Sequence, residues 1–278
     1  MNSLAYKFKG SGHEVPEEKR KYEEPDSRLA DAFKKWHMKP LKYRHTYEDV
    51  SSLLKKIKPR IDEAHALVVA NYDDSDPMSS GLFLSAVYNA STEKDIIFDL
   101  CVPVSKLGTH LAKDKRLVAY TPVHNLGSGT LHGKIVNFAD TKKVDGIKFT
   151  TSFEVLAGSI LVNYGTAIYL PGAGVIINTS PNWSLDYSRI SPSWRVLPGF
   201  YFDVRCELGD TLVTLEVPKE KRDEEQSRKQ NPRLHAHCKK LREIVEAGRQ
   251  KPFEMLDKLD ATKIKKDLEK ILKQEGLL

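Results

Sequence analysis

The chain has 278 residues, of which 40% are hydrophobic and 29% are charged, as in an ordinary globular protein. No apolar run reaches the ~18 residues of a membrane span, and the first residues lack the apolar core of a signal peptide, so we expect a cytoplasmic protein without a membrane partner. The net charge of +6 is concentrated at the end of the chain, because residues 218–278 contain 17 Lys and Arg against 12 Asp and Glu, whereas residues 81–217 contain 12 of each. A neutral central region argues against nucleic acid as a partner along its surface.

The N-terminal part of the chain predicts a polar segment followed by helices. Residues 1–26 mix Lys, Glu, Gly and Pro with few apolar side chains, and we expect them to be disordered. Residues 27–65 predict a helical segment that is interrupted at Pro59. Its first helix has three apolar residues on one face: Leu29, Phe33 and Trp36. Residues 64–72 suit a buried strand or the last turns of a helix equally well.

Three carboxylates stand directly before the next predicted helix: Asp73, Asp74 and Asp76. Hard oxygen ligands of this kind could bind Mg²⁺ or Ca²⁺. In the alternative interpretation Asp76 is the N-cap of the helix and Pro77 its first residue, and the nearby acids are stabilised by the helix dipole. We favour the cap and expect no metal or cofactor, although the residue types alone do not decide between a bound cation and a cap.

Residues 66–217 are expected to form a β-rich core, because a short pattern repeats over residues 117–179. Each clear copy is a glycine followed by a β-branched run, and the copies end at three asparagines: Asn137, Asn163 and Asn178. Short strands punctuated by glycine are typical of the rungs of a β-solenoid. In a solenoid the asparagines would stack and satisfy each other's amides, and they could also adopt the left-handed conformation at a turn. A β-sandwich or a meander is the alternative.

These rungs resemble the right-handed parallel β-helix of the GXGXG type, which closes the large subunit of glutamate synthase and recurs in a formylmethanofuran dehydrogenase subunit. The segment 73–89 is similar to one that precedes such repeats in small uncharacterised archaeal proteins, and the resemblance covers about residues 66–190. The literal motif is split, because Gly127-Ser-Gly129 gives one half and Gly172-Ala-Gly174 the other. The resemblance implies a mainly β fold, a right-handed parallel β-solenoid core with α-helical N- and C-terminal appendages. The family's domain is mainly structural, so no catalytic residue follows from it.

An aromatic and proline-rich loop follows the solenoid stretch over residues 181–195. The loop contains the residues that we regard as a possible ligand or partner surface: Trp183, Tyr187, Arg189, Trp194 and Arg195. Aromatic side chains beside arginines can form a pocket or an interaction hot spot. They can equally cap the open end of a solenoid, and we favour capping. Two alternating segments then predict a hairpin around residues 207–210.

Residues 218–278 are expected to form a basic helical tail. A charged stretch at residues 219–230 precedes two amphipathic helices with narrow apolar stripes, which are marginal alone and need an apolar surface to cover. Either the solenoid, whose edge would otherwise expose unpaired backbone groups, or a second molecule could provide that surface.

The cysteines and histidines do not predict a zinc site. The odd number of cysteines, Cys101, Cys206 and Cys238, suits reduced thiols, and we expect the first two to be small buried residues in strands. The only cluster of these residue types is His235-Ala-His-Cys238, and no second cluster completes the four ligands that zinc normally takes. We expect solvated histidines beside a buried cysteine there.

The chain contains no P-loop, nucleophile elbow, metalloprotease motif or dinucleotide fingerprint. His110, His124 and His132 lie in or beside the solenoid stretch, where one of them could line a cleft, but a lone histidine is more often a surface residue. We therefore expect a non-catalytic β-solenoid scaffold or protein-interaction module that acts through a protein partner or self-association. The alternatives are an accessory domain or enzyme related to glutamate synthase or formylmethanofuran dehydrogenase, and a nucleic-acid binder that uses the basic tail.

Overall fold

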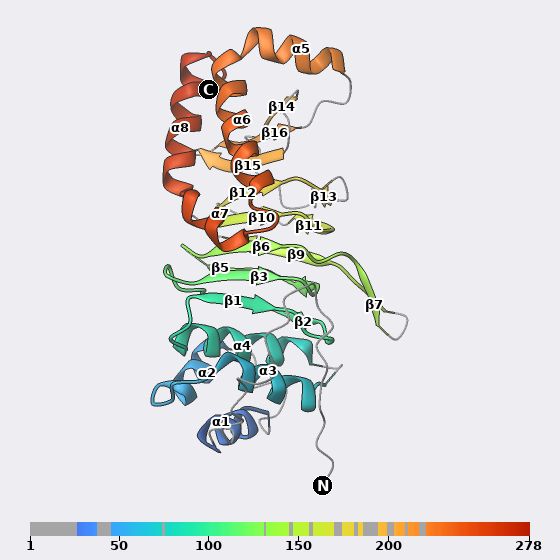
Figure 1. Ribbon diagram of the computed structural model, residues 1–278, viewed down its shortest axis with the longest axis vertical. Helices are drawn as coiled ribbons and strands as arrows, with labels where there is room; N and C mark the ends of the chain where they lie inside the picture. The colour runs from blue at the N-terminus through green and yellow to red at the C-terminus, as the bar shows by residue number, and fades with distance from the viewer. Residues whose placement is uncertain are drawn as a thin grey trace.

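The computed structural model of the protein describes residues 27–37, 46–73, 76–130, 132–144, 147–155, 158–169, 174–180, 183–185, 194–198, 203–208, 211–216 and 221–278. A layer of helices and a stack of parallel strands follow one another along the long axis, and a second group of helices lies beside and above the upper strands (Figure 1). The predicted fold class, a parallel β-solenoid core with flanking helices, is thereby confirmed. The expected disorder of residues 1–26 lies outside the described residues, and the predicted unit boundaries stay a prediction.

Four helices form the N-terminal layer: α1 (Ser27–His37), α2 (Tyr47–Leu54), α3 (Ile61–Ala70) and α4 (Pro77–Ala90). The ambiguous segment 64–72 thus falls mostly in a helix. Nearly every residue of α4 is buried, because this helix lies between the other helices and the first turn of the solenoid. Gly81 permits the close approach, since a Cβ atom there would come within 1.8 Å of the Ser105 carbonyl oxygen.

The main sheet of the solenoid begins with five parallel strands that pair without a shift in register: β1 (Asp95–Phe98), β3 (Arg116–Ala119), β6 (Lys134–Asn137), β10 (Ile160–Asn163) and β12 (Val175–Asn178). Equivalent residues therefore form columns along the stack. One inward column packs with the N-terminal helices in a single hydrophobic cluster: Ile96, Leu117, Ile135, Leu161 and Ile176.

The other strands complete the turns and close the upper end of the stack. A second parallel sheet contains β5 (Leu126–Thr130), β9 (Thr151–Val155), β11 (Ala167–Tyr169) and β13 (Trp183–Leu185). Two short pairs are β2 (Val104–Ser105) with β4 (Val123–His124), and the antiparallel β7 (Lys142–Val144) with β8 (Ile147–Phe149). Beyond β12 the main sheet continues with β15 (Asp203–Leu208), β16 (Thr211–Glu216) and β14 (Trp194–Pro198). The antiparallel pairing of β15 and β16 confirms the predicted hairpin.

A buried ladder of asparagines runs through the interior of the solenoid. Asn137 Nδ2 donates to Asn163 Oδ1 over 2.7 Å, and Asn163 Nδ2 donates to Asn178 Oδ1 over 2.7 Å. The expected stacking of amides is confirmed. The asparagines do not adopt the left-handed conformation that the sequence also allowed, because all three lie within strands, and the positive-φ non-glycine residues in the described ranges are Lys106, His110 and Asn125.

The C-terminal helices are α5 (Lys221–Gln230), α6 (Pro232–Ala247), α7 (Pro252–Lys258) and α8 (Ala261–Gln274). Helices α6 to α8 lie along the outer face of the main sheet (Figure 1). Val118, Val136 and Val162 on that face are fully buried in one cluster with apolar residues of the three helices. The surface that the tail covers is therefore the face of this chain's own sheet. None of the helices in the described ranges has the length and apolarity needed to cross a membrane.

The cysteines differ in their surroundings. Cys238 is buried between α6 and the sheet, as expected. Cys101 is exposed, which corrects the expectation of a buried residue. The reason is that β1 already ends at Phe98, so that Cys101 lies in the bend that follows. The side chain of Cys206 lies outside the described residues.

Candidate functional site

The outer face of the main sheet has an uncovered region at β1. Helix α7 packs on β3 and β6 but leaves β1 open, so that Ile97 is 51% exposed whereas Val118, its neighbour in the same column, is 0% exposed. Tyr120, directly after β3, is 37% exposed. Among the described residues the only other exposed large hydrophobic side chain is Ile168, which lies on the second sheet. Exposed apolar side chains that adjoin one another indicate a contact surface more strongly than isolated ones.

Tyr120 is the end of a column of stacked aromatic rings. Its ring lies 5.1 Å from that of Phe138 with an interplanar angle of 8°, and Phe138 lies 4.7 Å from Tyr164 with an angle of 7°. The column follows from the register, because each ring comes directly after the equivalent strand of the stack. The Tyr164 end of the column is covered, since the Tyr164 hydroxyl donates to the carbonyl oxygen of Val245 in α6 and Arg249 lies over the Tyr164 ring at 5.3 Å.

Arg116 marks the boundary between the covered and the open region. Its guanidinium group pairs with Asp95 of β1 and, over 2.6 Å, with Asp257 of α7. It also donates to the Phe253 carbonyl oxygen over 3.2 Å and lies 5.4 Å from the centre of the Phe253 ring. Arg116 thus joins α7, which covers the neighbouring strands, to the uncovered strand β1.

The open end of the aromatic column carries a negative charge. The Tyr120 amide donates to the Phe98 carbonyl oxygen over 2.8 Å, which places Asp99 beside Tyr120 at the next level of the stack. Burial raises the pKa of the Tyr120 phenol, and the Asp99 carboxylate raises it further. Within the described part of the chain Asp99 has no ion-pair partner. We name Ile97, Asp99 and Tyr120 the β1 patch.

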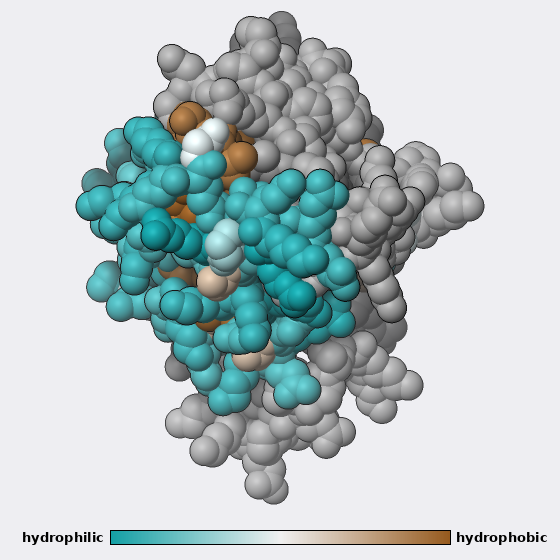
Figure 2. Space-filling model, turned by 90° about the horizontal axis from the view of Figure 1, so that it is seen from above, coloured by the Kyte–Doolittle hydropathy of each residue, from teal (hydrophilic) through white to brown (hydrophobic). Residues whose placement is uncertain are grey.

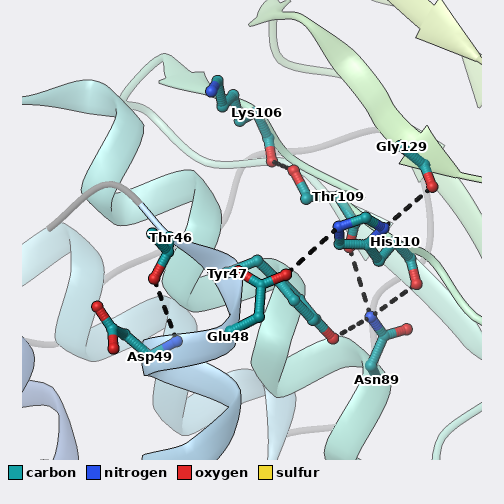
Figure 3. A network of polar contacts seen from close by, with 9 residues as sticks. All are labelled: Thr46, Tyr47, Glu48, Asp49, Asn89, Lys106, Thr109, His110 and Gly129. Atoms are coloured by element: carbon teal, nitrogen blue, oxygen red, sulfur yellow. Dashed lines mark hydrogen bonds and ion pairs between the residues drawn. The ribbon is translucent and has the colours of Figure 1, made fainter.

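A polar network joins the N-terminal helices to the corner after β2 (Figure 3). Asn89 Nδ2 donates to the Tyr47 hydroxyl over 2.7 Å and to the His110 carbonyl oxygen over 3.1 Å, while Asn89 Oδ1 accepts from the Ala112 amide over 2.9 Å. Burial raises the pKa of Tyr47, although its hydrogen bond with Asn89 acts in the opposite direction. The interior of this network is saturated with hydrogen bonds and holds α2, α4 and the corner together.

Within this network only His110 and Glu48, which lie on its solvent-exposed side, could take part in proton transfer. His110 has a positive φ of 52°, and its Nδ1 lies 3.1 Å from the Gly129 carbonyl oxygen, so this nitrogen carries a proton. Its Nε2 faces Glu48 at 4.0 Å (Figure 3). An imidazole beside a carboxylate can exchange protons, but both side chains are open to solvent and only the backbone-held histidine is fixed.

The other two histidines near the solenoid do not join this network. His124 lies in β4, and its Nδ1 is 3.1 Å from the Ser152 hydroxyl, which also accepts from the Asn125 amide over 2.7 Å. His132 is exposed. Both fit the expectation of hydrogen-bonded or exposed surface residues.

Three of the five residues that we regard as a possible ligand or partner surface begin strands at the upper end of the solenoid. Trp183 begins β13, and Trp194 and Arg195 begin β14, which are terminal strands of the second and the main sheet. Tyr187 and Arg189 lie outside the described residues. The side chains of Trp183, Trp194 and Arg195 are not described either. Their role as a cap or a binding surface stays a prediction.

Asp76, the last of the three carboxylates before α4, is the N-cap of this helix. Asp76 Oδ1 accepts from the Ser79 amide over 3.1 Å, its other oxygen accepts from the Ser79 hydroxyl, and Pro77 is the first residue of the helix. Asp74 lies outside the described residues. No group of three or more His, Cys, Asp or Glu residues that could hold a metal occurs in the ranges that the structure describes.

The cluster at the start of α6 corrects another expectation. His235 is buried rather than solvated, because this face of α6 packs between the sheet and α8. His237 is partly buried, and burial lowers its pKa. These positions are explained by helix packing and bring no second pair of ligands together.

Comparison with known proteins gives no relative. No protein-family model matches the chain, and neither a curated protein nor a solved structure matches it significantly. The structure therefore supports a parallel β-helix, while the resemblance to the GXGXG type stays a prediction.

Proposed function

We propose that the protein is a β-solenoid scaffold that binds another protein, or a second copy of itself, through the β1 patch. The observation that carries this proposal is the change in exposure within one column of the outer face, from 0% at Val118 to 51% at Ile97. A β-branched side chain in a strand is normally half-buried or buried. Here it is presented to solvent beside an exposed aromatic ring, which is the residue type enriched in interaction hot spots.

The test is affinity purification of the tagged full chain from its native cells, followed by quantitative mass spectrometry. The parent would be compared with Ile97→Asp and with Ile168→Asp, since Ile168 is 39% exposed but lies on the second sheet. We expect one or more proteins to be retained by the parent and the Ile168 variant and lost by the Ile97 variant. In parallel, sedimentation over a range of concentrations would reveal self-association that only Ile97→Asp abolishes. Identical partners and identical association for all three proteins would contradict the proposal.

A second candidate function, nucleic-acid binding through the tail, is favoured by one feature of α8. Four exposed lysines follow one another at spacings of three and four residues, which places them on one side of the helix: Lys263, Lys266, Lys270 and Lys273. Only Lys273 has an ion-pair partner within the described part of the chain, Glu269 at 2.6 Å. Seen from above, the end of the molecule that the C-terminal helices form has a largely hydrophilic surface (Figure 2).

Fluorescence anisotropy with single-stranded RNA and duplex DNA tests this second candidate. If three or four phosphates are neutralised, affinity should fall roughly 40- to 150-fold for duplex DNA and roughly 20- to 50-fold for single-stranded RNA between 50 and 200 mM salt. Lys266→Glu with Lys270→Glu should abolish binding, whereas Lys113→Glu, an exposed lysine outside the tail, should not. Absence of binding by the parent at the lower salt concentration would reject this function.

We also propose that the solenoid is of the GXGXG type. The parallel register and the glycine-to-asparagine rungs support this assignment. An experimental structure that superposes turn by turn on the glutamate synthase domain would establish it, and a different turn geometry would exclude it. An adjacent amidotransferase or molybdenum-enzyme gene would favour the alternative role as an accessory domain of such an enzyme.

A further inference from the structure

We infer that the β1 patch binds an arginine side chain of the partner, which contacts the exposed ring of Tyr120 and pairs with the carboxylate of Asp99. This inference rests on the proposed function and names the chemistry of the group that the patch would recognise.

The first argument is that the aromatic column is closed at one end and open at the other. Tyr164 has Phe138 stacked on it and Arg249 over it, and its hydroxyl is bonded to α6. Tyr120 is stacked only on Phe138 among the described residues and remains 37% exposed. Successive levels of a parallel stack lie about 4.8 Å apart, so the level below Tyr120 is where the column of rings would continue.

The second argument is the charge at that next level. Asp99 occupies it instead of a fourth ring, because the pairing of Phe98 with Ala119 continues to Asp99 beside Tyr120. The face of an aromatic ring is negative, as is a carboxylate, so neither group stabilises the other. A cation that contacts both groups would be attracted by both. A guanidinium group is planar, stacks on aromatic rings and donates two parallel hydrogen bonds to a carboxylate, a geometry that an ammonium group does not match.

The third argument is that the same chain already contains this combination a few residues away. Arg116 pairs with Asp95, which lies on the same outer side of β1 as Asp99, and its guanidinium group lies over the ring of Phe253. Carboxylate, guanidinium and aromatic ring are thus assembled at one end of β1. At the other end the carboxylate and the ring are present, and the guanidinium is the component that a partner would supply.

Ile97 explains why the partner would be a protein segment rather than free arginine. Alternate residues of a strand point to the same side, so Ile97 lies between Asp95 and Asp99 on the outer face. Its exposed side chain adjoins the arginine position and can cover the methylene groups of the arginine or an apolar neighbour. Charge and apolar contact together favour a basic segment with an apolar residue next to its arginine.

The test is an NMR titration of the full ¹⁵N-labelled chain with capped pentapeptides that contain two arginines, two lysines or two glutamates among glycines. We expect the arginine peptide to shift the amide signals of residues 97–101 and Tyr120, with a weaker effect of the lysine peptide and none of the glutamate peptide. Asp99→Asn and Tyr120→Leu should each weaken binding about three- to fivefold, the range of an exposed ion pair or cation–π contact. The control is Glu243→Gln, which removes an exposed carboxylate of α6 and should leave binding within about twofold of the parent. All three substituted residues are at the surface, and the dispersion of each spectrum reports whether the variant is folded.

Equal binding of the arginine and lysine peptides, unchanged binding by Asp99→Asn, or shifts confined to other surfaces would overturn the inference. The proposed function fails separately. If Ile97→Asp loses the partner while the arginine peptide shifts nothing in the β1 patch, the interaction stands and the arginine is rejected. If the peptide binds at the patch but Ile97→Asp keeps every partner, the site stands and the proposed function is rejected.

Discussion

The outer face of the main sheet consists of a covered region over β3 to β12 and an open region at β1. Val118, Val136 and Val162 in the covered region and Ile97 in the open region belong to one column and are all β-branched. Their surroundings differ because α6, α7 and α8 extend over the first three residues and end before the fourth.

The comparison shows that an apolar residue of a strand belongs to the core only where another element packs over it. Burial of apolar area contributes about 25 cal/mol per Å², so the covered residues stabilise the fold while Ile97 contributes little. An exposed side chain of this kind is available for a partner.

The largest loss of stability is expected in the asparagine ladder, which is buried along its whole length. Asn163→Leu would leave Asn137 Nδ2, the Gly165 carbonyl oxygen and Asn178 Oδ1 without their present partner. At about 1–3 kcal/mol for each of the three unsatisfied buried groups, the free energy of unfolding should fall by roughly 3–9 kcal/mol. Urea denaturation measures it. Asn71→Ala, which removes an exposed side-chain bond to the Leu67 carbonyl oxygen, should cost less than about 1 kcal/mol; similar losses for the two variants would contradict a buried ladder.

The next effect concerns the cover itself. Leu256 of α7 is fully buried against the sheet, and Leu256→Ala should lower the free energy of unfolding by about 2–5 kcal/mol. Ile168→Ala, on the exposed side of β11, should cost less than about 1 kcal/mol. Denaturant titration of both proteins gives the comparison. If Leu256→Ala is as mild as Ile168→Ala, the helix does not cover the sheet.

The pH dependence of stability tests whether the inner face of β1 is buried although its outer face is exposed. His65 lies between Tyr88, which is 2.8 Å from its Nε2, and the edge of Phe98, and burial lowers its pKa to about 4 against a weak opposing effect of Asp62. A lowered histidine pKa means that the folded state holds the neutral ring, so stability is full above pH 6.5 and falls between pH 6.5 and about 4. The loss should reach at most about 3 kcal/mol. His65→Gln should remove this part of the pH profile while the carboxylate-dependent part remains, and an unchanged profile would show that the histidine is solvated.

The smallest effect is expected at the boundary. Arg116→Met removes the ion pairs with Asp95 and Asp257, both of which are partly exposed. Stability should fall by about 1 kcal/mol at low salt, and the difference should shrink at 1 M NaCl, where charges are screened within about 3 Å. Thermal melting at the two salt concentrations measures it. A loss that does not depend on salt would mean that packing of the side chain, and not its charge, holds α7 to β1.

Much of the architecture could be predicted, because it depends on local patterns. The apolar face of α1, the Asp76 cap of α4 and the hairpin of β15 with β16 each follow from residues close together in the sequence. The stacking of the asparagines followed from the repeat. Their conformation did not, because asparagine tolerates both a turn and a strand, and only the ladder of amides decides between them.

The rest depends on contacts between distant parts of the chain. The apolar pattern of residues 64–72 suits a strand and a helix equally well, and packing on α4 selects the helix. His235 is polar, and nothing nearby in the sequence shows that α8 covers it. The β1 patch was missed for the same reason. Aligning the rungs would have placed Ile97 in the column of Val118, but that alignment gives no sign that the cover ends between them.

The most direct test of this account compares two charges placed in adjacent positions of one column. Val118→Asp and Ile97→Asp differ only in whether α7 lies above the substituted residue. Unfolding free energies from urea denaturation should fall by more than about 3 kcal/mol for Val118→Asp and by less than about 1 kcal/mol for Ile97→Asp. Equal losses, in either range, would contradict the division of the outer face into a covered core and an open patch.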